Sequence, residues 1–177
     1  MQSLSEYLDI FVRVCAVYAC MFVLFILNII SVSAPLSITI DVPFMLMTFY
    51  YWSIYRPTLI PPALVFSAGI CLDLLSGWPV GLNAFIFLVL RHNVASQRIF
   101  LTGQPFMVIW FGYMIVGSGA LFMQWLLFGL MRLQWNSLEP VFLSAFISIL
   151  IFPIISLVLH LSHKILPEIQ GQYSAVT

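Results

Sequence analysis

Long apolar stretches separated by short polar turns make up most of this chain. No formal charge occurs between Val14 and Ile40, and further apolar runs follow as far as Leu161. An apolar run of about 20 residues predicts a membrane-spanning helix, because lipid offers the backbone no hydrogen-bond partners. We therefore predict an all-α integral membrane protein with a single membrane domain over residues 1–177. Its six expected spans cover residues 10–30, 43–55, 58–75, 80–97, 106–130 and 140–161.

Prolines, glycines and a capping acid mark the expected ends of these spans. Asp41 followed by Pro43 is a helix-start signal, and the Arg56-Pro57 pair ends the second span. Pro61-Pro62 opens the third span, and Gly77 is well placed as its C-cap. The cluster Tyr50, Tyr51, Trp52 and Tyr55 is expected at headgroup level, where such rings are favoured.

Two of the expected spans are short for a bilayer. Residues 43–55 would extend about 20 Å as a helix, against a hydrocarbon core of about 30 Å. The apolar run 80–90 is shorter still unless Arg91 extends its side chain toward the interface. Such helices need longer neighbours around them, so a compact six-helix bundle is expected rather than a row of independent anchors.

Composition supports a membrane protein and excludes other classes. The chain is 63% hydrophobic and 7% charged, whereas a soluble domain of this length has about a quarter of its residues charged. Six basic and six acidic residues give a net charge of zero. A nucleic-acid-binding role therefore has no electrostatic support.

The positions of the charges predict an orientation. Alternating spans place five basic residues on the side of the termini and one on the other side. The five are Arg13, Arg56, Arg91, Arg98 and Lys164, and the opposite side has Arg132 with Asp41, Asp73 and Glu139. Basic loops stay in the cytoplasm, so both termini are predicted to be cytoplasmic.

Asp73 is the strongest candidate for a special role. It lies near the C-terminal end of the third span, where both the helix dipole and the low dielectric disfavour an unpaired carboxylate. Its expected partners are the backbone N–H groups of the turn 76–81, Asn83, or Arg132. Anchoring of the turn is the favoured interpretation, and binding of an ion or substrate is the alternative.

Other chemistry finds little support in the residues. His160 and His163 share one helix face but lack a third metal ligand nearby. Cys15, Cys20 and Cys71 lie in apolar stretches and are predicted to be buried thiols. No catalytic motif is present, so we predict neither an enzyme nor a cofactor. Small residues at Ala63, Ser67 and Cys71, next to Ala68 and Gly69, predict a close approach by another helix, either of this chain or of another subunit.

One stretch of the sequence resembles the signature of the rod shape-determining protein MreD family. It runs from Pro43 through Tyr51-Trp52, Arg56-Pro57 and Phe66 to Gly69-x-x-x-Asp73-Leu-Leu-Ser76-Gly77-x-Pro79-x-Gly81-Leu-Asn-Ala84, about 40 of 177 residues. The motif residues Arg56, Pro57, Gly69, Asp73, Ser76, Gly77, Pro79 and Gly81 are the candidate structural or interaction site. Two positions depart from the pattern: Asp41 precedes the proline instead of following it, and Trp78 stands where a small residue is usual.

The resemblance implies a non-enzymatic scaffold subunit of the bacterial cell-wall elongation complex in the inner membrane. Its implied partners are MreC and, indirectly, MreB and the RodA–transpeptidase pair. The implied fold is similar to the substrate-binding subunits of energy-coupling-factor transporters. A small-molecule-binding transporter subunit is therefore the alternative function, with Asp73, Asn83, Asn93 and Gln124 as intramembrane polar groups. An intramembrane enzyme is a third, weaker possibility.

Overall fold

The structure, a computed structural model, describes the backbone of residues 2–32, 42–133, 135 and 137–165. Within these residues the fold is all-helical and contains no strand, which confirms the all-α part of the prediction. The helices are α1 (Gln2–Val32), α2 (Phe44–Tyr55), the 3-10 helix η1 (Pro57–Leu59), α3 (Pro62–Ser76), α4 (Leu82–Ser96), α5 (Arg98–Thr102), α6 (Phe106–Arg132) and α7 (Glu139–Ile165).

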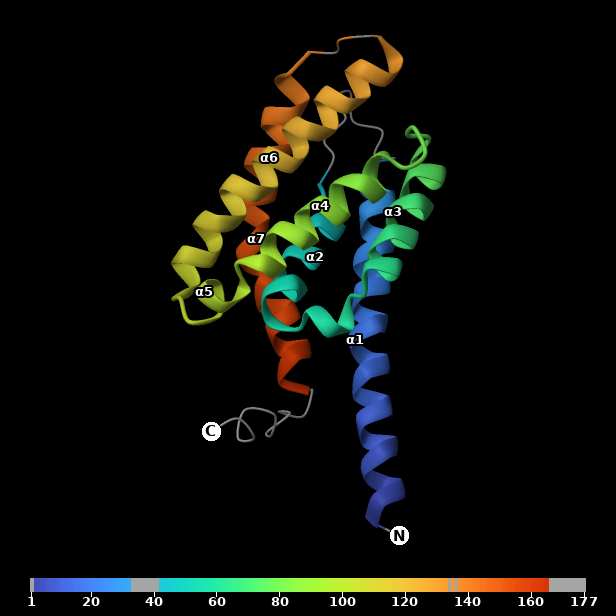
Figure 1. Cartoon of the computed structure of the whole chain (residues 1–177), viewed down its shortest axis with the longest axis vertical. Coiled ribbons are helices and arrows are strands. Elements are labelled where there is room, and N and C mark those ends of the chain that lie inside the picture. The colour runs from blue at the N-terminus through green and yellow to red at the C-terminus, as the bar shows by residue number, and fades with distance from the viewer. Residues whose placement is uncertain (1, 33–41, 134, 136, 166–177) are drawn as a thin grey trace.

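Two of these helices are long and apolar enough to cross a membrane. They are α6 and the segment Glu139–Ser162 of α7. Shorter apolar segments occur in α1, α3 and α4 (Figure 1). The first turns of α1, the η1 segment, α5 and the C-terminal end of α7 lie toward one side of the molecule. The turn between α3 and α4, the end of α6 and the start of α7 lie toward the other side.

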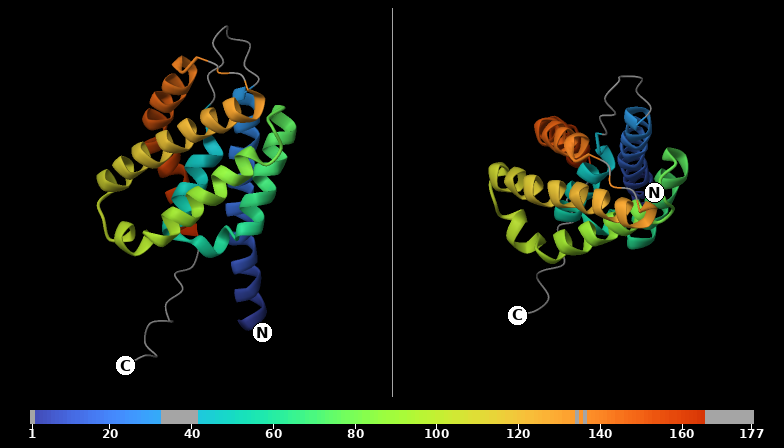
Figure 2. Two further views of the ribbon diagram at one scale, coloured as in Figure 1. Left: turned by 45° about the horizontal axis from the view of Figure 1, so that its top comes forward. Right: turned by 90° about the horizontal axis from the view of Figure 1, so that it is seen from above.

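The short helix α2 lies in the centre of the molecule. It contacts α1, α4, α6 and α7, and every residue from Met45 to Ile54 is buried. Figure 2 shows α3, α4 and α6 on one side of α2, with α1 and α7 on the other. This arrangement agrees with the expectation that a helix too short for the bilayer is surrounded by longer ones. Tyr50, Tyr51 and Trp52 of this helix are buried in the core of the bundle.

Several helix boundaries differ from the prediction: α1 begins at Gln2 instead of residue 10, for example. Residues 58–61 do not belong to the third helix, because η1 precedes it and α3 begins at Pro62. The fourth helix ends at Ser96 and is followed by the separate helix α5. Pro43 is the N-cap of α2 and not a residue of its first turn; Asp41 lies outside the described residues.

A side chain from another helix caps α2 in place of a local residue. The Asn28 side-chain oxygen in α1 accepts a hydrogen bond from the Met45 N–H at 3.0 Å. Asn28 is buried, and Met45 is the second residue of α2. The first N–H groups of a helix have no partner within it, so this bond satisfies a buried donor and joins α1 to α2.

The helix α7 contains a proline, and a side chain of α6 replaces the hydrogen bond that this proline removes. Pro153 has no N–H, so the carbonyl of Ile149, four residues earlier, lacks its usual helical donor. The Trp110 indole N–H in α6 donates to this carbonyl oxygen at 3.0 Å. In an apolar environment an unpaired carbonyl is costly, and this bond removes the cost while holding α6 against α7.

We predict that Trp110→Phe lowers the free energy of unfolding by about 1–3 kcal/mol, the cost of leaving one buried acceptor unpaired. Unfolding of the detergent-solubilised protein by denaturant would measure it. In a Pro153→Ala background the backbone donor returns, so the same change should cost clearly less. Equal losses in the two backgrounds would contradict this account.

Candidate functional site: the turn between α3 and α4

The Asp73 carboxylate, which is 0% exposed, lies at the junction of α3 and α4. One of its oxygens accepts a hydrogen bond from the Gly81 N–H at 2.8 Å. The Asn83 N–H lies 3.1 and 3.2 Å from the two oxygens, and the Asn83 side-chain amide donates to the carboxylate at 2.7 Å. The predicted pairing with the turn backbone and with Asn83 is confirmed.

These contacts resolve the apparent misplacement of an acid at the end of α3. Gly81 is the N-cap of α4, and Asn83 is the second residue of that helix. Asp73 is therefore in the last turn of its own helix but at the N-terminus of the next one. A carboxylate is stabilised at a helix N-terminus by the unpaired N–H groups and the helix dipole.

Arg132, the third predicted partner of Asp73, lies elsewhere. Its guanidinium is 5.7 Å from the centre of the Phe128 ring in α6, in a cation–π geometry. The other neighbour of this ring is Trp78, whose ring centre is 5.0 Å away in an edge-on arrangement. The unusual tryptophan of the turn thus packs against the C-terminal part of α6.

Two glycines give the turn its shape. Gly77 ends α3 with φ +70°, and Gly81 begins α4 with φ +95°. Residues with a Cβ rarely adopt this conformation. The N–H groups of Gly77 and Trp78 both donate to the Asp73 carbonyl oxygen, the latter at 3.0 Å. The prediction that Gly77 is the C-cap of α3 is confirmed, and the Pro79 carbonyl accepts the Leu82 N–H at 3.2 Å.

The backbones of α3 and α4 are in direct contact one turn from Asp73. A Cβ on Gly69 would lie 2.3 Å from the Ala84 Cα and 2.5 Å from its nitrogen, so only glycine fits there. The expected small-residue stripe is on a different face, since Ala63, Ser67 and Cys71 are exposed. Exposure of Cys71 and Cys15 also corrects the expectation that these thiols are buried.

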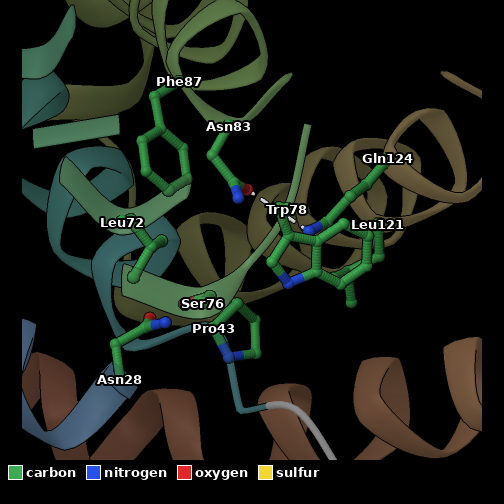
Figure 3. Close-up of a pocket in the computed structure, with 9 residues that line it drawn as sticks. All are labelled: Asn28, Pro43, Leu72, Ser76, Trp78, Asn83, Phe87, Leu121 and Gln124. Carbon is green, nitrogen blue, oxygen red and sulfur yellow. Dashed lines mark hydrogen bonds between the residues drawn. The ribbon is translucent and has the colours of Figure 1, made fainter. Parts of the chain in front are cut away.

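A chain of polar side chains continues from Asp73 into the bundle. The Asn83 side-chain oxygen accepts a hydrogen bond from the Gln124 amide of α6 at 3.3 Å (Figure 3). These two residues, with Asn28 and Ser76, contribute polar groups to a cavity of about 30 Å³. The Ser76 hydroxyl is buried without a hydrogen-bond partner within the described part of the chain. Asn93 does not join this group, because its amide donates to the Val89 carbonyl of its own helix.

The size of this cavity limits what it holds in this conformation. About 30 Å³ accommodates one or two waters, at roughly 10–15 Å³ of probe volume each. Small-molecule sites are typically about 300–1,000 Å³. Asn83 and Gln124, two of the four polar groups that suggested a transporter subunit, therefore border a space fit for water and not for a vitamin-sized molecule.

The remaining motif residues lie at the opposite end of α3. The Arg56 N–H caps α2 by donating to the Trp52 carbonyl, and Pro57 begins η1. The guanidinium of Arg91 donates to the Ile60 carbonyl at 2.6 Å and to the Pro57 carbonyl at 3.5 Å. The predicted motif is thus two separate structures: a turn containing Gly69 to Gly81, and an Arg91-braced connection that contains Arg56 and Pro57.

The sequence motif did not include Asn28 or Arg91, although both stabilise these connections. Each stands out as a polar residue inside an apolar run, which was the available signal. Among the described residues, no group of three or more His, Cys, Asp or Glu is close enough to hold a metal ion. The His163 side chain lies outside the described residues.

No family model, no curated protein and no solved structure matches this chain.

We predict that Gly69→Ala destabilises the protein by at least about 1–3 kcal/mol, as overpacking against a backbone does. The matched control is Gly119→Ala in α6, where a Cβ meets nothing within 4 Å; it should be neutral or slightly stabilising. Thermal unfolding in detergent compares the two. A Gly69→Ala protein as stable as the control would show that α3 and α4 are further apart than described.

Proposed function

We propose that this protein is a six-span inner-membrane scaffold subunit of the bacterial cell-wall elongation complex, of the MreD kind, with no catalytic activity of its own. The observation that carries the proposal is the corner between α3 and α4. The residues that resemble the MreD signature there, from Gly69 to Ala84, are the ones that lock two helices together. Fixing two helices relative to each other is the role expected of a motif needed for assembly.

The charges and helix directions support the proposed orientation. Arg56 and Arg98 lie near the ends of α2 and α5, on the side of the molecule where α1 begins (Figure 1). Arg132 and Glu139 lie on the other side, at the end of α6 and the start of α7. In the proposed topology the first side is cytoplasmic, the termini included, and the Asp73 corner is at the opposite surface.

The contacts of Asp73 favour a scaffold over a binding or catalytic role. Its carboxylate is buried and accepts hydrogen bonds from three N–H groups of α4. A carboxylate whose oxygens are occupied by these hydrogen bonds stabilises the turn and is not available to a ligand or substrate. Leu74, Leu75 and Val80 project from the corner as exposed apolar side chains, and they form the surface that we propose for MreC. Through MreC the protein would connect to MreB and to the RodA–transpeptidase pair.

Depletion of the protein in a rod-shaped host tests this function. We expect the cells to become round and affinity purification from their membranes to recover MreC with the intact protein. Rods that keep their shape after depletion would refute the proposal.

Within that function, we predict that Asp73→Ala and Gly77→Val reduce recovery of MreC several-fold. The first leaves buried N–H groups of α4 unpaired, at about 1–3 kcal/mol each, and the second places a β-branched residue at φ +70°. Gly103→Ala is the matched control, because this glycine lies in the connection at the other side and its Cβ meets nothing within 4 Å. Recovery should be compared at measured membrane levels. Equal levels and equal recovery for all three variants would contradict the prediction.

A further inference from the structure

A second cavity, remote from the Asp73 corner, lies between α2, the start of α6 and α7. Its volume is about 400 Å³, within the range of small-molecule sites. The side chains that line it are Tyr51, Tyr55, Phe106, Pro153, Ser156, Leu157 and His160. Neither the corner nor the proposed scaffold role uses this space.

The cavity is bordered by side chains that also face the outside of the molecule. Leu157 is 60% exposed and Phe106 is 43% exposed, although both line the cavity. They belong to α7 and α6, the two helices that are long and apolar enough to cross a membrane. The neighbouring outward residue Ile154 is 63% exposed. A molecule that enters between Leu157 and Phe106 therefore comes from apolar surroundings.

The lining changes from polar to apolar along α7. The Tyr51 hydroxyl lies 3.5 Å from the His160 Nδ1 at one end, and Pro153 is seven residues deeper, about 10 Å along the helix. Tyr51 and Tyr55 are in the last turns of α2, and Phe106 is the first residue of α6. The polar end of the cavity thus coincides with helix ends, which in a spanning protein lie near the headgroups.

The Ser156 hydroxyl is a buried polar group at this cavity. Ser156 is 6% exposed and lines the cavity. A hydroxyl in an apolar environment is stabilised by a hydrogen-bond partner. Its position on α7 is between His160 at the polar end and Pro153 at the apolar end. A bound molecule with an acceptor at this depth would accept a hydrogen bond from the Ser156 hydroxyl.

We infer that this cavity binds one membrane phospholipid. The phosphate oxygens accept hydrogen bonds at the Tyr51–His160 end, an ester carbonyl accepts from the Ser156 hydroxyl, and an acyl chain lies along Leu157 and Pro153. Hydroxyl and imidazole N–H groups are donors suited to these acceptors. A phospholipid combines this head chemistry with an apolar tail and reaches the cavity from the bilayer. The inference depends on the membrane spans and not on the scaffold role.

Native mass spectrometry of the full chain, purified in mild detergent, tests for the bound lipid. We expect the wild-type protein to retain one phospholipid per chain and Ser156→Phe, which places a ring in the middle of the cavity, to lose it. The matched control Ile154→Trp adds bulk to the outer face of the same helix and should retain the lipid. Retention by Ser156→Phe equal to that of the wild type, or no bound lipid in the wild type, would overturn the inference.

A thermal-shift titration with dioleoylphosphatidylglycerol tests the same inference with other variants, in case Ser156→Phe does not fold. Bound lipid should raise the Tm of the wild type, and Ser156→Ala should require about fivefold more lipid for the same shift, the ratio expected from one hydrogen bond. Leu157→Trp, at the partly exposed entrance, should also weaken the effect. Inorganic phosphate at equal concentration should have no effect. An equal shift with phosphate alone, or unchanged titrations for both variants, would overturn the inference.

Discussion

The Asp73 carboxylate and the first N–H groups of α4 form the interaction on which the arrangement of α3 and α4 depends. The Asp73 carboxylate is buried, and α4, whose N-cap is Gly81, has no side-chain cap of its own. In a low-dielectric environment both would be costly alone. The carboxylate accepts hydrogen bonds from three N–H groups, so the buried acid and the start of α4 are both paired. These bonds also fix the direction in which the chain leaves the turn.

The consequences extend into the rest of the bundle. With the turn fixed, α3 and α4 run back along each other closely enough that only glycine fits at position 69 opposite Ala84. Asn83 then turns its side-chain oxygen to Gln124 and joins the pair to α6. Trp78 adds a second connection to α6 through Phe128. The corner therefore joins three helices and is a suitable rigid base for a protein whose proposed work is to hold partners.

The same rule governs the other polar contacts within the apolar interior: a backbone group left unpaired by local sequence receives a side chain from another helix. Asn28 supplies the acceptor for the start of α2, Trp110 supplies the donor missing at Pro153, and Arg91 bonds to the carbonyls between α2 and α3. Each bond joins elements that are far apart in the sequence. A different kind of polar group, the Ser156 hydroxyl, borders the large cavity of the inferred lipid site.

Local chemistry along the chain determined the helical class, most helix ends and the importance of Asp73. Apolar run length, prolines and the Gly77 cap act over a few residues, so the sequence shows them directly. Which face of a helix meets which neighbour was decided only by tertiary packing. Thus the small-residue stripe at Ala63, Ser67 and Cys71 is exposed while Gly69 makes the close contact, and the aromatic residues of α2 are in the core. The partner of Asp73 was narrowed to three candidates by the sequence, and the short turn placed α4, rather than Arg132, within reach. The physical reason is that backbone propensities are local, whereas the pairing of buried polar groups depends on how the helices cross.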